Sequence, residues 1–252
     1  EFLPHTDKEL NELAQRLDES VEVLNNKVKS LKEFNPMLGH RGCRLAITYP
    51  EIYLMQAQAI AEAAIECINK GLNPSVEVMI PLVATDKELE ILRKQVIEVI
   101  DQTQKQAEVE FNYLVGTMIE LPRAALTADE IAIHADFFSF GTNDLTQTCL
   151  GLSRDDSGRF LQSYVHAGIF SEDPFVSIDQ KGVGSLVKTA CELGRKTKEN
   201  IKLGICGEHG GDPQSVEFFH NVGLDYVSCS PYRVPVARLS AAQSALKNEL
   251  SK

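Results

Sequence analysis

Apolar runs of strand length alternate with amphipathic helical segments along most of this chain, and this order limits the fold more than any other feature. The strand-length runs lie at residues 76–83, 112–120, 137–140, 202–206 and 225–230. Segments with helical periodicity lie between and after them. Buried strands that alternate with amphipathic helices form βα units and a parallel sheet. The sequence therefore predicts an α/β fold.

The segments ahead of the first clear strand are less regular. Residues 6–34 have apolar positions at helical spacing, with Thr6 or Asp7 as a cap, and predict one helix. Residues 43–47 form a weak strand-like run, which adds a sixth strand to the five clear ones. Residues 52–71 predict a further helix, which Gly71 ends.

A parallel sheet of this kind either stays open and doubly wound or closes into a (β/α)8 TIM-type barrel. No glycine-rich phosphate loop follows any predicted strand, as a nucleotide-binding open sheet would require. Polar residues instead follow several different strands, a distribution typical of barrels, whereas open sheets concentrate their chemistry at one point. These residues are Glu120, Asn143, Asp144, Cys206, Glu208 and His209. We therefore expect a barrel, formed by a single domain that covers residues 1–252.

Composition narrows the classes of partner. The chain has 252 residues, of which 43% are apolar, and its formal net charge of −11 argues against nucleic acid as a partner. No apolar run approaches the roughly 20 residues of a membrane helix, and no signal peptide opens the chain. Six cysteines without a CxxC pair indicate free thiols in a reducing cytoplasm rather than disulfides or a zinc site.

Two carboxylates are candidates for a metal site. Glu120 and Asp144 follow consecutive strands, so both would face the same edge of the sheet. Mg²⁺ commonly takes two protein carboxylates and completes its shell with water and substrate. The alternatives are a solvent-facing carboxylate for Glu120 and a helix N-cap for Asp144.

Three further groups are candidates for a substrate site. The loop of Gly141, Thr142 and Asn143 offers backbone N–H groups and an amide to an anion, although a simple tight turn is the commoner use of such residues. Arg41 and Arg154 follow glycine-containing loops, and arginine suits bidentate phosphate binding, which in an acidic chain points to a small anionic substrate.

Cys206 and His209 lie in the segment GICGEHGGDP. For Cys206 the alternative to chemistry is a small buried core thiol. The histidines lack zinc-type spacing, and for His209 a role in orienting the loop is favoured over proton transfer.

Six long segments resemble, in order, the phosphoenolpyruvate-utilising enzymes. They are NPMLGHRGCRLAITYPEIYLMQ, GTMIELPRAAL, FFSFGTNDLTQ, SRDDSGRFL, GICGEHGGDP and GLDYVSCSPYRVPVARLSAAQ. The wording RGCR and SRDD, and a longer stretch at about 155–181, resemble the dikinase branch rather than enzyme I of the sugar phosphotransferase system. The resemblance covers nearly the whole chain.

The resemblance implies a phosphotransferase that interconverts pyruvate and phosphoenolpyruvate with Mg²⁺. It implies that Glu120 and Asp144 bind the metal and that Gly141, Thr142 and Asn143 bind substrate. It further implies that Arg41 and Arg154 hold the phosphoryl group and that Cys206 protonates the enolate carbon. Apart from the resemblance, we expect the neighbouring Glu208 and His209 to set the protonation of Cys206. Implied partners are phosphohistidine and ATP-binding domains and a second copy in a homodimer.

The same resemblance implies that two strands, each with a substrate-binding arginine, precede residue 1, so that this chain holds strands three to eight. We then expect little or no activity from the chain alone. A synthase barrel, an inactive substrate-binding fragment and a Mg²⁺-dependent lyase that needs no cysteine are the alternatives. The expected compartment is the cytoplasm, or an organelle if a targeting segment lies upstream.

Overall fold

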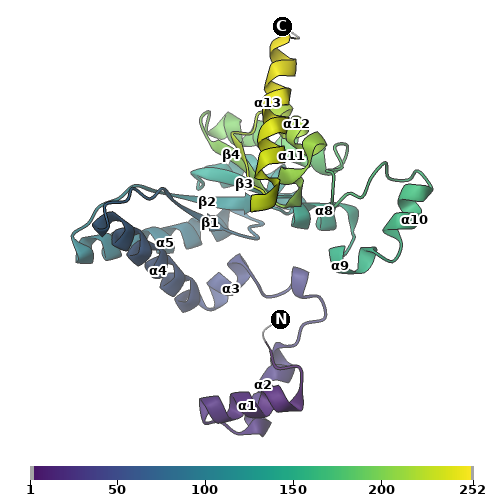
Figure 1. The fold of residues 1–252 in the computed structure, drawn as a ribbon. Coiled ribbons are helices and arrows are strands. Elements are labelled where there is room, and N and C mark those ends of the chain that lie inside the picture. Colours follow the sequence, from purple (N-terminus) through teal and green to yellow (C-terminus); the bar gives the residue numbers. More distant parts are fainter. Residues whose placement is uncertain (1–2, 251–252) are drawn as a thin grey trace. The chain divides into compact units, whose positions relative to one another are not determined.

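The computed structural model describes residues 3–250, and the side chains of residues 3–247. Two compact units make up the chain, one ending at Arg41 and one beginning at Gly42 (Figure 1). The expectation of one domain over residues 1–252 stays a prediction. Across the residues described, no helix has the length and the apolar character that crossing a bilayer requires.

The first unit contains two helices where the sequence predicted one. They are α1 (Asp7–Leu17) and α2 (Val21–Leu31), followed by the short 3-10 helix η1 (Pro36–Leu38). The single-helix prediction is wrong because Asp18 takes a left-handed conformation with a φ of 53° and ends α1. The Ser20 side chain then accepts a hydrogen bond from the backbone N–H of Val23 and begins α2.

A five-stranded parallel sheet forms the centre of the second unit. The strands follow chain order from β1 to β5, each paired with the next. Their bounds are β1 (Val76–Ile80), β2 (Tyr113–Ile119), β3 (Phe137–Gly141), β4 (Lys202–Cys206) and β5 (Tyr226–Val227). All five clear strand predictions are confirmed, and the sheet is open.

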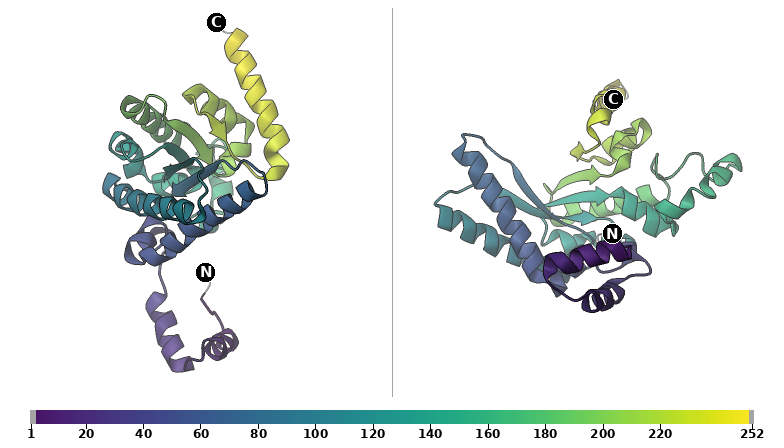
Figure 2. Two further views of the ribbon diagram at one scale, coloured as in Figure 1. Left: turned by 90° about the vertical axis from the view of Figure 1, so that its left-hand side faces the viewer. Right: turned by 60° about the horizontal axis from the view of Figure 1, so that its bottom comes forward.

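Helices and short 3-10 helices precede, connect and follow these strands. They are α4 (Pro50–Asn69), α5 (Asp86–Ala107), α6 (Pro122–Leu126), α7 (Ala128–Ala132), α8 (Thr142–Leu150), α9 (Arg154–Ser157), α10 (Leu161–His166), α11 (Val183–Thr197), η2 (Glu208–Gly211), α12 (Pro213–Val222), η3 (Pro231–Arg233) and α13 (Val234–Leu250). The α9–α10 segment and α13 extend away from the sheet in the views of Figures 1 and 2.

The sixth predicted strand is wrong, because residues 43–47 lie in the helix α3 (Cys43–Thr48). Cys43 and Ala46 are its buried positions, and their spacing of three residues fits one helical face. The backbone N–H of Cys43 donates to the carbonyl of Pro81, just after β1. This segment therefore packs on the end of the sheet without extending it.

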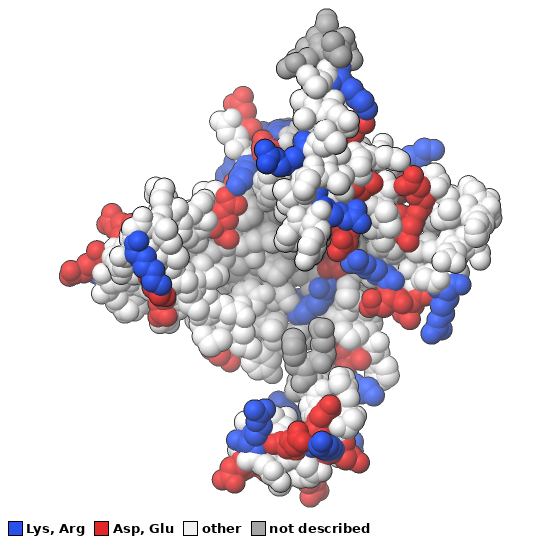
Figure 3. Space-filling model, in the orientation of Figure 1, with Lys and Arg blue, Asp and Glu red and all other residues white. Residues whose placement is uncertain are grey.

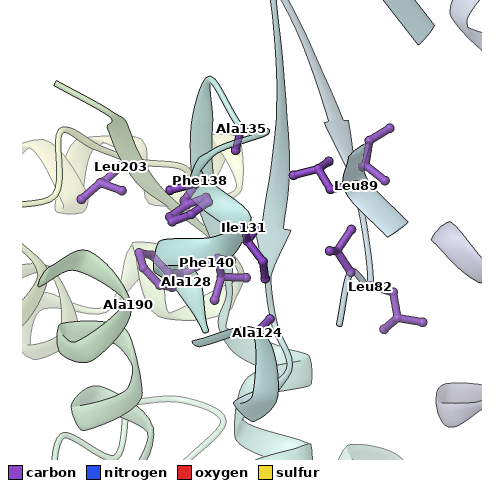
Figure 4. Packing of buried hydrophobic residues seen from close by; sticks show 14 of the residues in the cluster. Leu82, Leu89, Ala124, Ala128, Ile131, Ala135, Phe138, Phe140, Ala190 and Leu203 are labelled. Carbon is purple, nitrogen blue, oxygen red and sulfur yellow. The ribbon is translucent and has the colours of Figure 1, made fainter. Parts of the chain in front are cut away.

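The core lies on one face of the sheet. Phe138, Phe140 and Leu203 extend from the strands into a cluster with helical residues (Figure 4), and Val78 and Val115 belong to the same cluster. The alternate strand positions lie on the opposite face. Phe137 and Ser139 are buried there, whereas others are partly or largely exposed: Glu77, Met79, Leu114, Met118 and Tyr226. The sheet therefore has one face packed by helices and one that carries mixed polar and apolar side chains.

Candidate functional site

The carboxyl ends of the three central strands bring together Glu120, Gly141 and Cys206. Ile119 pairs with Phe140, and Gly141 pairs with Cys206, so these strand-end positions lie side by side on one face. A Cβ atom at Gly141 would lie 2.8 Å from Oε2 of Glu120. The absence of a side chain at Gly141 therefore gives the Glu120 carboxylate its place.

The Glu120 carboxylate is buried and oriented by the end of the neighbouring strand. Its side chain is 5% exposed, and Oε1 accepts a 2.6 Å hydrogen bond from the backbone N–H of Leu82. Leu82 follows β1 with a φ of 62°, which is rare for a residue with a side chain. The Leu82 carbonyl in turn lies 3.0 Å from Sγ of Cys43. This arrangement excludes the solvent-facing alternative for Glu120.

Asp144 lies in the first turn of α8 and is half-buried. It is not the N-cap, because α8 begins at Thr142. Its Oδ1 accepts a 3.1 Å hydrogen bond from Nε2 of Gln147, while Oε1 of Gln147 accepts a 2.9 Å bond from the backbone N–H of Arg154. Gln147, which the sequence analysis missed, thus links Asp144 to Arg154.

The two predicted arginines are placed differently. Arg154 is exposed and its Nη2 lies 3.8 Å from Oε1 of Glu208, beyond the end of β4. Arg41 belongs to the first unit, where its Nε donates a 2.9 Å hydrogen bond to the carbonyl of Met37. Arg154 therefore lies near the strand-end residues, and a part for Arg41 in the site stays a prediction.

Cys206 is partly buried, and its Sγ lies 3.7 Å from the carbonyl oxygen of Phe140. Burial raises the pKa of the Cys206 thiol, a hydrogen bond with Ser139 lowers it, and the negative charge of Glu120 raises it. The net direction is upward, so the group is a thiol at neutral pH. A protonated sulfur near the Glu120 carboxylate has a proton to donate.

Ser139 and Tyr226 are two further site residues that the sequence analysis missed. Both share the face of Cys206 in the sheet register. Gly204 leaves room for Tyr226, since a Cβ atom there would lie 2.1 Å from the tyrosine ring. Burial raises the pKa of Tyr226, and a hydrogen bond with Ser139 lowers it. The signal in the sequence was a serine among the three phenylalanines of β3.

His209 lies on η2 with its ring fully buried. Its Nδ1 lies 2.7 Å from Oγ1 of Thr142, and its Nε2 lies 2.9 Å from the carbonyl oxygen of Pro174. Burial lowers the pKa of this imidazole. The contact with Thr142 agrees with the predicted role of His209 in orienting the loop.

The donor set limits which metal could bind. Within the described part of the chain, no three His, Cys, Asp or Glu side chains converge as a complete metal site. The two carboxylates Glu120 and Asp144 fit Mg²⁺, which takes few protein ligands, better than zinc, which takes three or four. On the face in Figure 3, basic and acidic side chains are mixed, and the described residues there form no continuous basic patch.

Comparison with known proteins identifies the family. Residues 4–246 match the family described as PEP-utilising enzyme, PEP-binding domain. The chain belongs to this family. It is 58% identical to the pyruvate, phosphate dikinase of Clostridium symbiosum over 99% of this chain and 29% of that protein. It is 57% identical to the dikinase of Rhizobium meliloti over 98% of this chain and 28% of that protein.

A plant relative is also similar. The chloroplastic pyruvate, phosphate dikinase of Flaveria bidentis is 56% identical over 96% of this chain and 26% of that protein. Among solved structures, the citrate synthase SbnG aligns over 75% of this chain at 16% identity, with a TM-score of 0.39, which is too distant to support an argument. The chain thus spans less than a third of the length of the curated relatives named here.

Proposed function

We propose that this chain is the part of a pyruvate, phosphate dikinase that binds pyruvate and phosphoenolpyruvate and exchanges the methyl proton of pyruvate. The observation that carries the proposal is the alignment of Glu120, Gly141 and Cys206 at one edge of the sheet. A buried carboxylate, a side-chain-free backbone position and a protonated thiol are what an enolate-forming site needs.

The proposed closed form of the sheet is a (β/α)8 barrel. In support, five parallel strands follow one another in chain order, and helices pack on one face. The residues of the opposite face would then line the barrel interior, and the strand ends would form its catalytic rim.

We propose Mg²⁺ as the cofactor, held by Glu120 and Asp144. Both lie at the same strand edge, and Oε1 of Glu120 is fixed by Leu82 while Oε2 faces Gly141. The ion would supply Lewis-acid stabilisation of negative charge on the substrate. Gly141, Thr142 and Asn143 bind the substrate carboxylate or enolate oxygen through backbone and amide groups in this proposal.

Cys206 acts on the substrate carbon. In the direction of pyruvate, the S–H bond breaks, a C–H bond forms at the enolate methylene, and a thiolate remains. In the other direction the thiolate takes a methyl proton. Arg154 and Arg41 neutralise the charge of the phosphoryl group. To bind it, Arg154 would break its ion pair with Glu208, which costs little because an exposed pair at 3.8 Å is weak.

The partners proposed for the complete reaction lie outside this chain. A phosphohistidine domain would deliver the phosphoryl group to the enolate oxygen, an ATP-binding domain would load that histidine, and the full protein would be a homodimer. The cytoplasm is the proposed compartment, with an organelle as the alternative because chloroplastic relatives exist.

Replacing the buried carboxylate tests the metal proposal. Glu120→Gln keeps the shape but removes the charge, so Mg²⁺ binding measured by calorimetry should weaken by at least the roughly 10- to 100-fold typical of ligand-shell changes. Glu98→Gln, on the exposed side of α5, is the matched control and should bind as the wild type does. Unchanged binding by Glu120→Gln would contradict the metal assignment.

A further inference from the structure

The buried His209 joins three separate segments of the second unit. Its own helix η2 follows Cys206 at the end of β4. Its Nδ1 contacts Thr142, the first residue of α8, and its Nε2 contacts the carbonyl of Pro174 in the segment between α10 and α11. No part of the ring is exposed. The histidine therefore has no route to solvent and no nitrogen left over for a substrate.

The chemistry of the partners fixes the direction of both hydrogen bonds. The Pro174 carbonyl only accepts, so Nε2 carries the hydrogen of this bond. Burial lowers the pKa of His209, which keeps the ring neutral and leaves Nδ1 as an acceptor. The Thr142 hydroxyl must then donate to Nδ1, and its only hydrogen is committed to this contact.

A second contact connects the same two loops. The backbone N–H of Glu208 donates to Oδ1 of Asn143 at 3.4 Å. Gly207, with a φ of 139°, brings the backbone close to Thr142, because a Cβ atom there would lie 2.6 Å from Oγ1 of Thr142. The loop with Thr142 and Asn143 is thus held against the loop that carries Cys206.

We propose that His209, acting through the Thr142 hydroxyl, is a positioning residue that fixes the Asn143–Asp144 loop relative to the Cys206 thiol. The inference rests on the proposed function, because it concerns the site that would bind the enolate. Loss of the link shifts one loop against the other, and a displacement of about 1 Å costs on the order of 100-fold in rate at an oriented site.

The test uses methyl-proton exchange of pyruvate by a full-length dikinase that carries this sequence. His209→Met fills the space without hydrogen bonds, and Thr142→Val removes only the hydroxyl. Each should lower kcat by roughly 10- to 100-fold while KM for pyruvate stays within about 3-fold, since the lost contact orients and does not bind substrate. His209→Gln and Thr142→Ser, which retain polar groups, should recover most of the rate.

A double variant shows whether His209 and Thr142 act through one shared hydrogen bond or independently. The double variant His209→Met with Thr142→Val should be no slower than the worse single variant, because both remove one contact. His166→Gln, on the exposed α10, is the control and should match the wild type. Effects that multiply in the double variant would overturn the inference, as would single variants within about 2-fold of the wild-type rate.

A measurement that does not depend on enzymatic activity completes the test. Nitrogen NMR of the wild-type protein should show His209 as the neutral tautomer protonated at Nε2, and protonation at Nδ1 would overturn the inference. If His209→Met fails to fold, Thr142→Val decides the kinetic question. A wild type that binds pyruvate but exchanges no proton would contradict the proposed function. In that case the tautomer of His209, measured by NMR, still tests the hydrogen bond between His209 and Thr142.

Discussion

Gly141 has little room for a side chain at the position where substrate is proposed to bind. A Cβ atom there would lie 2.5 Å from Sδ of Met118 and 2.8 Å from the Glu120 carboxylate. Gly141→Ala should therefore displace Glu120 and weaken Mg²⁺ binding by about as much as removing a ligand-shell partner, roughly 10-fold or more. Calorimetry measures this.

The matched control is Gly158→Ala. Gly158 follows α9, and no atom lies within 4 Å of a Cβ built there. We expect this variant to bind Mg²⁺ as the wild type does. Equal binding by Gly141→Ala and Gly158→Ala would show that Glu120 does not need the space beside Gly141.

The raised pKa of Cys206 predicts a pH effect with a definite sign. Above the ordinary thiol pKa of roughly 8.5, the unfolded chain loses this proton before the folded protein does. Folding stability from this group therefore falls as pH rises through that window. Ultraviolet absorbance of the thiolate, wild type minus Cys206→Ala, should give a midpoint above the ordinary value.

Replacing Ser139 tests whether its hydrogen bond influences the pKa of Cys206. Its hydrogen bond lowers the pKa of Cys206, so Ser139→Ala should move the midpoint further upward. Ser240→Ala, in α13, is the control and should leave it in place. A downward movement in Ser139→Ala would contradict the hydrogen-bonding account.

Site residues at or just after the ends of strands were predictable from the sequence, and residues in the middle of strands were not. Glu120, Asp144 and Cys206 stand out because a polar or reactive group stands at, or shortly after, the end of an apolar run. Ser139 and Tyr226 reach the site only through the pairing of β3, β4 and β5, which the sequence does not specify by residue.

At the scale of elements, the βα rhythm predicted every strand of the sheet, and the errors lie ahead of it. Residues 43–47 are apolar enough for a strand, but the contact between Cys43 and Pro81 favours a helix against the end of the sheet. Two adjacent caps divide the first predicted helix, and a left-handed Asp18 is hard to infer from spacing alone.

The Asp136 carboxylate, just ahead of β3, links its own segment to α5 and β2. Both of its oxygens lie 3.0 Å from Nη2 of Arg93 on α5, and Oδ2 accepts a 2.9 Å bond from the backbone N–H of Val115 in β2. Asp136→Ala should lower the free energy of unfolding by about 2–3 kcal/mol, since it leaves a charge and a buried N–H without this partner. Denaturant unfolding measures the loss.

An exposed pair on the same helix provides the comparison. Lys94 and Glu98 lie 3.9 Å apart with side chains 78% and 63% exposed. Lys94→Ala should cost at most about 1 kcal/mol. Equal losses in Asp136→Ala and Lys94→Ala would show that Asp136 does not hold these elements together.

At the scale of the molecule, one face of the sheet is packed by helices and the other carries the site. The strand order and the one-sided core are consistent with an arc of the proposed barrel, in which the strand ends gather catalytic groups from many elements. The periodicity of the sequence could predict the parallel sheet with helices packed against it. It could not predict whether the sheet closes into a barrel, because closure depends on how strands pair across the whole domain.

Methyl-proton exchange of pyruvate in D₂O with Mg²⁺ tests the central claim most directly. A full-length dikinase with this sequence should exchange the protons, and Cys206→Ala should slow exchange by the roughly 100- to 10,000-fold typical of losing a positioned acid or base. Binding of Mg²⁺ should persist in that variant, because Glu120 and Asp144 are intact. Exchange at the wild-type rate in Cys206→Ala would contradict the account.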